Sequence, residues 1–366
     1  MLFTPAKIGT LELKNRLIRS ATQEGLADEK GFMDERIYDM YRDLAKGGVG
    51  LIITGHMYIH PSGRANPQMN GIYNDAHLPG LKKLVEVVHT EGGKICAQIN
   101  HAGMYADRET GLDLISASDT DKELFKRKAR AMTDHEIKDL IAAFAFSAAR
   151  AQEAGFDAVQ IHAAHGYLTS QFHSPLINKR TDKYGGDIFG RMTFLKEVTS
   201  AIREKVGADY PILIKLGMLD GLEGGLKLEE SVEIVKALQD MGIDGIELSG
   251  GLGGKKLTNI KKGIQNKDKE AYFMDFAEAA KPATDLPIIL VGGFRSKSVM
   301  EAALESGNVD LVSICRPLIN DPYFPNKMQN GEVEKSSCLS ANNCWAEKPG
   351  AGISCKCPTI EKELNE

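Results

Sequence analysis

Three polar rings lie close together in the segment IHAAHGYL, where His162 ends an apolar run and His165 and Tyr167 follow it. Two imidazoles at this spacing could bind a metal ion, hold an anionic or carbonyl oxygen, or serve only to close the end of a barrel. A metal site needs further acidic or cysteine ligands, and the sequence ties none to this loop. Spacing alone leaves the oxygen-holding and structural interpretations open.

Polar residues also end other apolar runs. Lys215 ends ILIKL, where a lysine is unusual because buried lysines are rare unless they are paired. Gln98 lies near the end of the run AQIN. It either contacts a ligand or is a polar group that closes the core. Arg316 offers a planar, permanently charged fork, and the pair Gly292 and Gly293 either exposes backbone N–H groups or only turns the chain. Side chains of these types are typical of an anion or cofactor site.

The elements that must position these residues are short apolar runs, separated by charged segments with helical spacing. The runs are NRLIRSA (15–21), GLIITG (50–55), KICAQIN (94–100), FDAVQIH (156–162), YPILIKL (210–216), GIDGIEL (242–248), LPIILVG (286–292) and VDLVSIC (309–315). Their continuous hydrophobicity is typical of parallel strands covered on both faces. An open doubly wound sheet also fits, but regularly spaced units favour a closed α/β barrel of the (β/α)8, or TIM barrel, class.

Such a barrel carries its chemistry at the carboxyl ends of its strands, where the polar residues above stand. We expect one barrel over residues 1–335 and a cysteine-containing tail over residues 336–366. The largest insertion, residues 101–132, is polar and charge-rich, and we expect it to form a lid or excursion over the barrel mouth.

Composition narrows the class of partner. The net charge of −5 gives no general attraction for nucleic acid or anionic lipid, so we expect a small-molecule substrate and neither a nucleic-acid nor a membrane partner. The N-terminus lacks an export pattern, and no apolar run has the roughly 20 residues needed to span a bilayer. We therefore expect a cytoplasmic protein. The sequence leaves a homo-oligomer open.

Longer motifs carry a resemblance to a known family. HAAHGYL followed by SPLINKRTDKYGG resembles the signature of the old yellow enzyme family of NADH:flavin oxidoreductases. The likeness continues through LKNRL, AQINHAG, VGGFRS and CRPLINDP, and so covers roughly residues 1–330. The branch that the chain most resembles is the barrel domain of 2,4-dienoyl-CoA reductases and enoate reductases.

The resemblance implies an FMN-dependent oxidoreductase that takes hydride from NADH or NADPH and passes it to an activated C=C bond by a ping-pong mechanism. It implies that His162 and His165 hold the electron-withdrawing group of the substrate and that Tyr167 protonates the neighbouring carbon. It assigns the FMN contacts to Ala21, Thr22, Gln23, His56, Gln98, Lys215, Gly292, Gly293, Phe294, Cys315 and Arg316.

Two alternatives accompany this interpretation. The first alternative is a flavin-linked amine dehydrogenase or demethylase, because relatives of the barrel oxidise amines. The histidine pair argues against it. The second alternative is a flavin-binding electron-transfer subunit of a larger complex. The presence of Tyr167 beside both histidines argues against it.

The tail resembles the iron–sulfur segment of the dienoyl-CoA reductase branch, but it departs from that pattern. Ala341 stands at the second expected ligand position, and one residue is missing before Cys344. A complete cluster would need Cys338, Cys344, Cys355 and Cys357 in unusual spacing. We therefore expect the tail to hold no metal or cluster.

Overall fold

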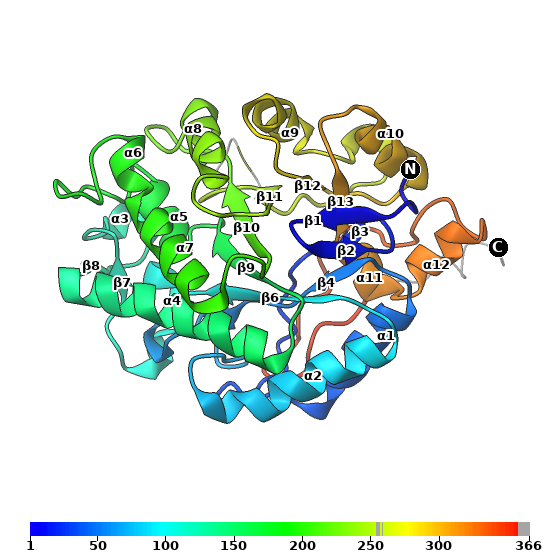
Figure 1. The fold of residues 1–366 in the computed structure, drawn as a ribbon, viewed down its shortest axis with the longest axis horizontal. Helices are drawn as coiled ribbons and strands as arrows, with labels where there is room; N and C mark the ends of the chain where they lie inside the picture. Colours follow the sequence, from blue (N-terminus) through cyan, green and yellow to red (C-terminus); the bar gives the residue numbers. More distant parts are fainter. Residues whose placement is uncertain (254–256, 258, 358–366) are drawn as a thin grey trace.

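Eight parallel strands close into a barrel with helices around its outside in the computed structural model, which describes residues 1–253, 257 and 259–357 (Figure 1). Strand β4 pairs with both β3 and β6, and this double pairing closes the sheet. The barrel strands are β3 (Leu17–Arg19), β4 (Leu51–Ile53), β6 (Ile95–Asn100), β9 (Ala158–Ala163), β10 (Ile212–Gly217), β11 (Gly245–Ser249), β12 (Ile288–Val291) and β13 (Leu311–Ile314). Each predicted run overlaps one of them, with β9, β10 and β11 extending one residue beyond their runs, so the predicted (β/α)8 barrel is confirmed.

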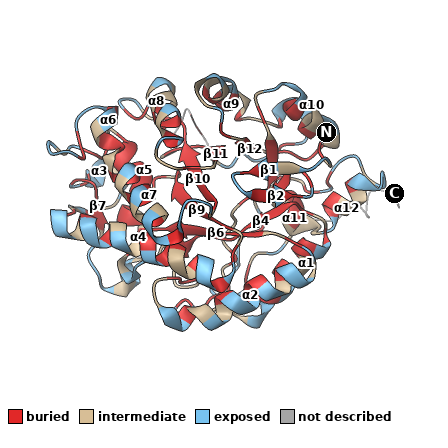
Figure 2. Cartoon of the chain, in the orientation of Figure 1, coloured by how far each residue is buried: buried red, intermediate tan, exposed pale blue. Residues whose placement is uncertain are grey.

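The outer helices are α1 (Glu35–Lys46), α2 (Leu78–Thr90), α4 (Asp134–Ala154), α7 (Thr193–Val206), α8 (Leu228–Leu238), α9 (Met274–Ala280) and α10 (Lys297–Glu305), with α11 (Arg316–Asn320) and α12 (Phe324–Gln329) after the last strand. Helix α4 shows how the sequence sets their ends. Thr133 and Glu136 form a reciprocal capping box at its start, and Gly155 ends it with a φ of 91°, which a residue with a side chain rarely adopts. The long outer helices α1, α2, α4 and α7 carry both buried and exposed residues along their length, as expected of helices with one face packed on the barrel (Figure 2).

The amino-terminal end of the barrel is closed by a hairpin. Strands β1 (Ala6–Ile8) and β2 (Leu11–Leu13) pair antiparallel, and Ile8, Leu11 and Leu13 pack against apolar residues near the beginnings of the barrel strands. The hairpin lies across the barrel in Figure 1. Because this end is filled with hydrocarbon, a ligand can enter the barrel interior only from the carboxyl ends of the strands.

Loops at the opposite end carry the remaining elements, which are β5 (Met57–Tyr58), β7 (Ile115–Ser116), α3 (Lys122–Phe125), β8 (Arg130–Ala131), α5 (Leu168–His173) and α6 (Ile188–Arg191). The insertion 101–132 holds β7, α3 and β8. Its Met104 and Ala129 pack with Ile177 in a small apolar cluster of their own.

No helix in the described part of the chain combines the length and the apolar character needed to cross a bilayer.

Candidate active site

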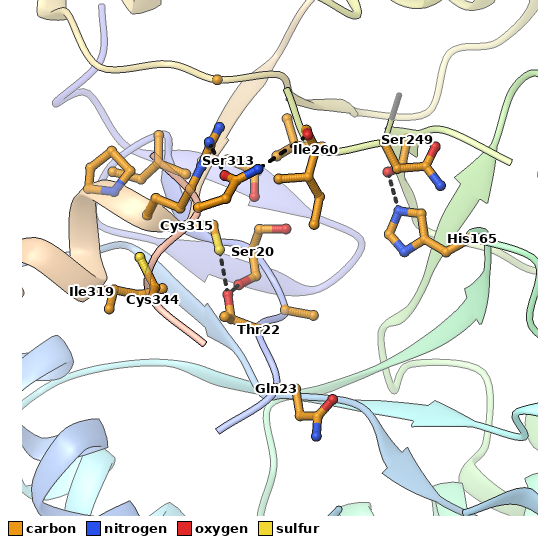
Figure 3. Close-up of a pocket in the computed structure, with 18 of the residues that line it drawn as sticks. Ser20, Thr22, Gln23, His165, Ser249, Ile260, Ser313, Cys315, Ile319 and Cys344 are labelled. Carbon is orange, nitrogen blue, oxygen red and sulfur yellow. Dashed lines mark hydrogen bonds between the residues drawn. The ribbon is translucent and has the colours of Figure 1, made fainter. Parts of the chain in front are cut away.

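One pocket of about 340 Å³ gathers the predicted site residues at the carboxyl ends of the barrel strands (Figure 3). Its volume lies within the range usual for small-molecule and cofactor sites. All of the predicted residues line it except Gly292, whose carbonyl oxygen instead accepts a hydrogen bond from the Tyr272 backbone N–H at 3.0 Å. No residue of the insertion 101–132 is among the lining residues, so the expected lid does not form part of the pocket wall.

Four rings meet at one side of the pocket, and we call His56, His162, His165 and Tyr167 the ring cluster. The centroid of the His162 ring lies 5.1 Å from that of His165 and 4.9 Å from that of Tyr167, both in edge-on arrangements. The His56 ring lies 5.0 Å from that of Tyr167. His162 is the second-last residue of strand β9, and the next two members of the cluster follow in the loop before α5, so a short stretch of chain positions three of the four rings.

Hydrogen bonds fix how the imidazoles present their nitrogens. His162 Nδ1 accepts from the Ala164 backbone N–H at 3.3 Å, so the proton of a neutral His162 must sit on Nε2. His165 has a φ of 60°, the left-handed region that side chains rarely occupy. Its backbone N–H donates to the Gly250 carbonyl, and its Nε2 lies 2.7 Å from Ser249 Oγ, which holds the ring toward strand β11 (Figure 3).

Burial keeps the ring cluster uncharged near neutral pH. It lowers the pKa of His56 to about 4 and that of His165 to about 3, with the positive charge of Lys215 acting in the same direction. Burial also lowers the pKa of His162 well below its usual value, and the neighbouring His165 lowers it further. Burial raises the pKa of Tyr167 to about 12, so the phenol keeps its proton. The cluster therefore offers neutral donors beside a weak acid.

Inside the barrel, directly beside the pocket, lies a hydrogen-bonded set that the sequence analysis missed. Glu247 is fully buried on β11, and its Oε1 accepts from Ser20 Oγ at 2.6 Å, Ser313 Oγ at 3.0 Å and Lys215 Nζ at 3.1 Å. Its Oε2 accepts from Gln160 Nε2 at 3.0 Å. Burial alone would raise the pKa of Glu247, but the charge of Lys215 and these hydrogen bonds outweigh it and lower the pKa. Glu247 is therefore ionised.

This partner changes the interpretation of Lys215. In the sequence, a lysine near the end of an apolar run indicates a cofactor contact. Lys215 does line the pocket, but its ammonium group is already paired with Glu247 and hydrogen-bonded to Ser20 Oγ at 2.8 Å. The signal that identified Lys215, a charged residue within a buried run, is also present in GIEL and could have identified Glu247.

At the other side of the pocket, Gly293, Phe294, Cys315 and Arg316 lie at the ends of β12 and β13. Gly293 has a φ of 76°, and a Cβ atom there would come within 2.8 Å of the Tyr272 ring, so only glycine fits without displacement. Cys315 Sγ lies 2.7 Å from Thr22 Oγ1 (Figure 3). An arginine beside close-approaching backbone is a suitable donor set for a phosphate group.

The described part of the tail completes the pocket on that side. Ser340, Asn342, Cys344, Trp345 and Ile353 line it, and we call these residues the tail wall. Asn342 Oδ1 accepts from the Arg316 guanidinium at 2.7 Å, and the Ile353 N–H donates to the Glu24 carbonyl at 3.0 Å. No motif in the sequence predicts these contacts.

Within residues 1–253, 257 and 259–357, no group of three or more His, Cys, Asp or Glu side chains is arranged to hold a metal ion. That range includes the tail cysteines. The expectation that they hold no cluster stays a prediction, which iron and sulfide analysis of anaerobically purified protein tests.

The chain is similar to known flavin oxidoreductases. The family model described as the NADH:flavin oxidoreductase / NADH oxidase family matches residues 1–335. The chain belongs to this family. A metal reductase of Desulforamulus reducens is 37% identical over 93% of this chain and 51% of its own length. The NADPH dehydrogenase of Bacillus subtilis is 35% identical over 91% of this chain and 96% of its own.

Among solved structures, a 2-naphthoyl-CoA reductase complex matches with a TM-score of 0.86 and 29% identity over 96% of this chain and 57% of that one. The chain thus spans about half the length of the metal reductase and of this reductase. Family membership confirms the predicted resemblance and, for the family, FMN as cofactor with NADH or NADPH as reductant.

Proposed function

We propose that this chain is an FMN-dependent oxidoreductase that uses NADH or NADPH to reduce activated C=C bonds in α,β-unsaturated carbonyl compounds, enoates or nitro compounds. The observation that carries the proposal is the ring cluster, which places neutral imidazole donors and a protonated phenol in the same pocket as Gln98 and Lys215. Family membership and the barrel support the class of reaction.

The residues present suit FMN. Gln98 and Lys215 offer an amide and a cation for the polar edge of the flavin ring, and Arg316 and the glycine turn at Gly293 suit its phosphate. The other proposed contacts are Ala21, Thr22, Gln23, His56, Gly292, Phe294 and Cys315. FMN, when bound, supplies the chemistry of hydride transfer between a nicotinamide and a substrate.

His162 and His165 would hold the electron-withdrawing group. Hydride addition to the β-carbon of such a substrate moves negative charge onto its carbonyl or nitro oxygen, and fixed N–H donors in a buried pocket stabilise that charge. His162 offers Nε2–H for this purpose because its Nδ1 is already an acceptor. His165 can offer Nδ1–H only if the Ser249 hydroxyl donates to its Nε2, which assigns Ser249 the role of selecting the tautomer.

Tyr167 would supply the proton. With a pKa of about 12, its phenol stays protonated over the working pH range and can transfer the proton to the carbon beside the electron-withdrawing group. In the net reaction the nicotinamide loses two electrons as hydride, and the C=C bond gains that hydride at one carbon and a proton at the other. One pocket would serve the nicotinamide and the substrate in turn.

The test is an anaerobic titration of the purified yellow protein with NADH and NADPH, followed by enones, enoates, nitroalkenes and amines. We expect one nicotinamide to bleach the flavin absorbance and the unsaturated compounds to restore it. Protein that neither contains nor takes up FMN would refute the proposal. Bleaching by amines without a nicotinamide would favour the amine dehydrogenase alternative.

A further inference from the structure

A charged pair crosses the inside of the barrel directly beside the proposed flavin site. Lys215 and Glu247 face each other in the register of β10 and β11, and both side chains are almost completely buried. Removing one partner of such a pair leaves an uncompensated buried charge, so the two depend on each other. Ser20, the residue after β3, and Ser313, on β13, donate to the same carboxylate.

Glu247 also determines the orientation of two amides. An ionised carboxylate can only accept hydrogen bonds, so Gln160 must turn its Nε2 to Glu247 and its Oε1 to Gln98. Gln98 must then donate its own Nε2 to Gln160 Oε1, at 2.7 Å. This relay leaves the carbonyl oxygen of Gln98, a pocket-lining residue, and the second N–H of its amide available to a ligand.

We propose that Glu247 is a positioning residue of the flavin site, which holds Lys215 and, through Gln160, makes Gln98 present an acceptor to the flavin ring. This inference rests on the proposed function, because it requires FMN to bind beside Gln98 and Lys215. The pyrimidine ring of a flavin carries one N–H between two carbonyl groups, and an amide oxygen is the complement of that N–H. A reversed amide would present a donor instead.

The same residue acts on the reduction potential. The negative charge of Glu247 offsets the positive charge of Lys215, so the site favours added negative charge less than an isolated lysine would. Reduction adds negative charge to a flavin. Glu247 therefore lowers the reduction potential of bound FMN.

The test compares Glu247→Gln with the wild-type holoenzyme in a redox titration and a fluorescence titration with FMN. The glutamine preserves size but removes the charge and can donate to Gln160, which permits the relay to reverse. We expect the ratio of the dissociation constants of oxidised and reduced FMN to rise at least tenfold, an upward shift of about 30 mV for a two-electron couple. We also expect oxidised FMN to bind roughly 2- to 12-fold more weakly, as for one lost hydrogen bond.

Asp220→Asn is the matched control, because Asp220 is a buried carboxylate that accepts from Ser174 Oγ at 2.6 Å but does not line the pocket. Its reduction potential should equal that of the wild type. A potential in Glu247→Gln that matches this control, or falls below it, would overturn the inference. Wild-type protein that fails to bind FMN would refute the proposed function instead.

Gln160→Leu separates the two effects and replaces the first variant should that one fail to fold. It keeps the pair of Glu247 and Lys215 but cuts the relay to Gln98. We expect weaker FMN binding by a similar factor with an unchanged reduction potential. Unchanged FMN affinity in a folded Gln160→Leu protein would overturn the assignment of Gln98 orientation to Glu247.

Discussion

The two sides of the pocket are assembled in different ways. Three members of the ring cluster come from one strand and the loop that follows it, and their backbone is fixed by local contacts such as the hydrogen bond from the His165 N–H to the Gly250 carbonyl. The tail wall reaches its place through contacts between distant parts of the chain, such as Asn342 with Arg316 and Ile353 with Glu24. One side is a property of the barrel strands, and the other depends on a segment beyond the residues that the family model matches.

This difference suggests that the two sides of the pocket have different functions. The ring cluster holds the groups proposed for substrate chemistry, His162, His165 and Tyr167, which lie on β9 and in the loop that follows it. The side that contains Arg316 and the tail wall holds the groups proposed for retaining the cofactor. Changes to His162, His165 or Tyr167 should therefore alter reaction rates with little effect on FMN binding, and changes on the second side should do the reverse.

The largest effect should come from Tyr167→Phe, which removes the phenolic proton and keeps the ring. Bleaching of the flavin by the nicotinamide should stay near the wild-type rate, because that half-reaction needs no acid at a substrate carbon. Restoration of the absorbance by an enone should slow by roughly 10² to 10⁴, as is usual for the loss of a general acid. Stopped-flow absorbance measures both rates.

A nitroalkene provides the internal control for this variant. Its reduced product, a nitronate, persists without immediate protonation, so restoration by the nitroalkene should remain fast. Equal slowing with both acceptors would show that Tyr167 positions the substrate rather than donating the proton. Unchanged rates with both would remove it from the mechanism.

The next largest effect should be on FMN binding in Arg316→Ala. A charge-assisted hydrogen bond contributes about 1.5 to 3 kcal/mol, so the dissociation constant of FMN should rise roughly tenfold to 150-fold. Fluorescence titration of the apoprotein measures it. Arg42→Ala is the control, because Arg42 pairs with Asp39 on the surface of α1. FMN affinity that is equal in both variants would contradict the role of Arg316.

The buried imidazoles should make the protein sensitive to acid. The pKa of His165 is lowered to about 3 by burial, so the folded state keeps it neutral while the unfolded state binds a proton below about pH 6.5. The unfolded state thus binds more protons between these values, and stability falls as the pH falls from 6.5 toward 3. The loss from this residue approaches about 1.4 kcal/mol per pH unit, or about 2 kcal/mol at pH 5.

Chemical denaturation of the apoprotein between pH 5 and pH 8 measures this dependence. His165→Gln should reduce the slope of unfolding free energy against pH by about one proton. His135→Gln is the control, because the side chain of His135 is 86% exposed on α4 and lies outside the pocket. A slope in His165→Gln identical to that of the wild type would show that the imidazole is not held neutral by burial.

How far the sequence predicts each region follows from the range of its contacts. The barrel and the ring cluster were predictable because the strand runs are periodic and IHAAHGYL places its rings within a few residues. Glu247 was predictable in principle, since a carboxylate inside an apolar run needs a partner as much as Lys215 does. The tail wall was not, because no local pattern records that Asn342 lies against Arg316 or that Trp345 lines the pocket. The insertion 101–132 was expected to form a lid or excursion over the barrel mouth, whereas residues of the tail, and none of the insertion, line the pocket.

The smallest expected effect is on FMN binding in Asn342→Ala. This variant tests whether the tail wall belongs to the flavin site. Asn342 Oδ1 accepts from the Arg316 guanidinium, whose other acceptors are the carbonyls of Lys261 at 2.8 Å and Ser340 at 3.4 Å. Losing one of these hydrogen bonds should let the guanidinium move and weaken FMN binding roughly 2- to 12-fold. The reaction rates at saturating FMN should not change, because the ring cluster is untouched.

The double variant of Asn342→Ala and Arg316→Ala shows whether Asn342 affects FMN binding through Arg316 or directly. If Asn342 acts only by orienting Arg316, adding Asn342→Ala to Arg316→Ala should weaken FMN binding no further, because the group to be oriented is already absent. Fully additive losses would show that Asn342 contacts the flavin by itself. Wild-type FMN affinity in the single variant would mean that the tail lies against the pocket without contributing to it. In that case Arg316 and the ends of the last two strands would have to retain the cofactor alone.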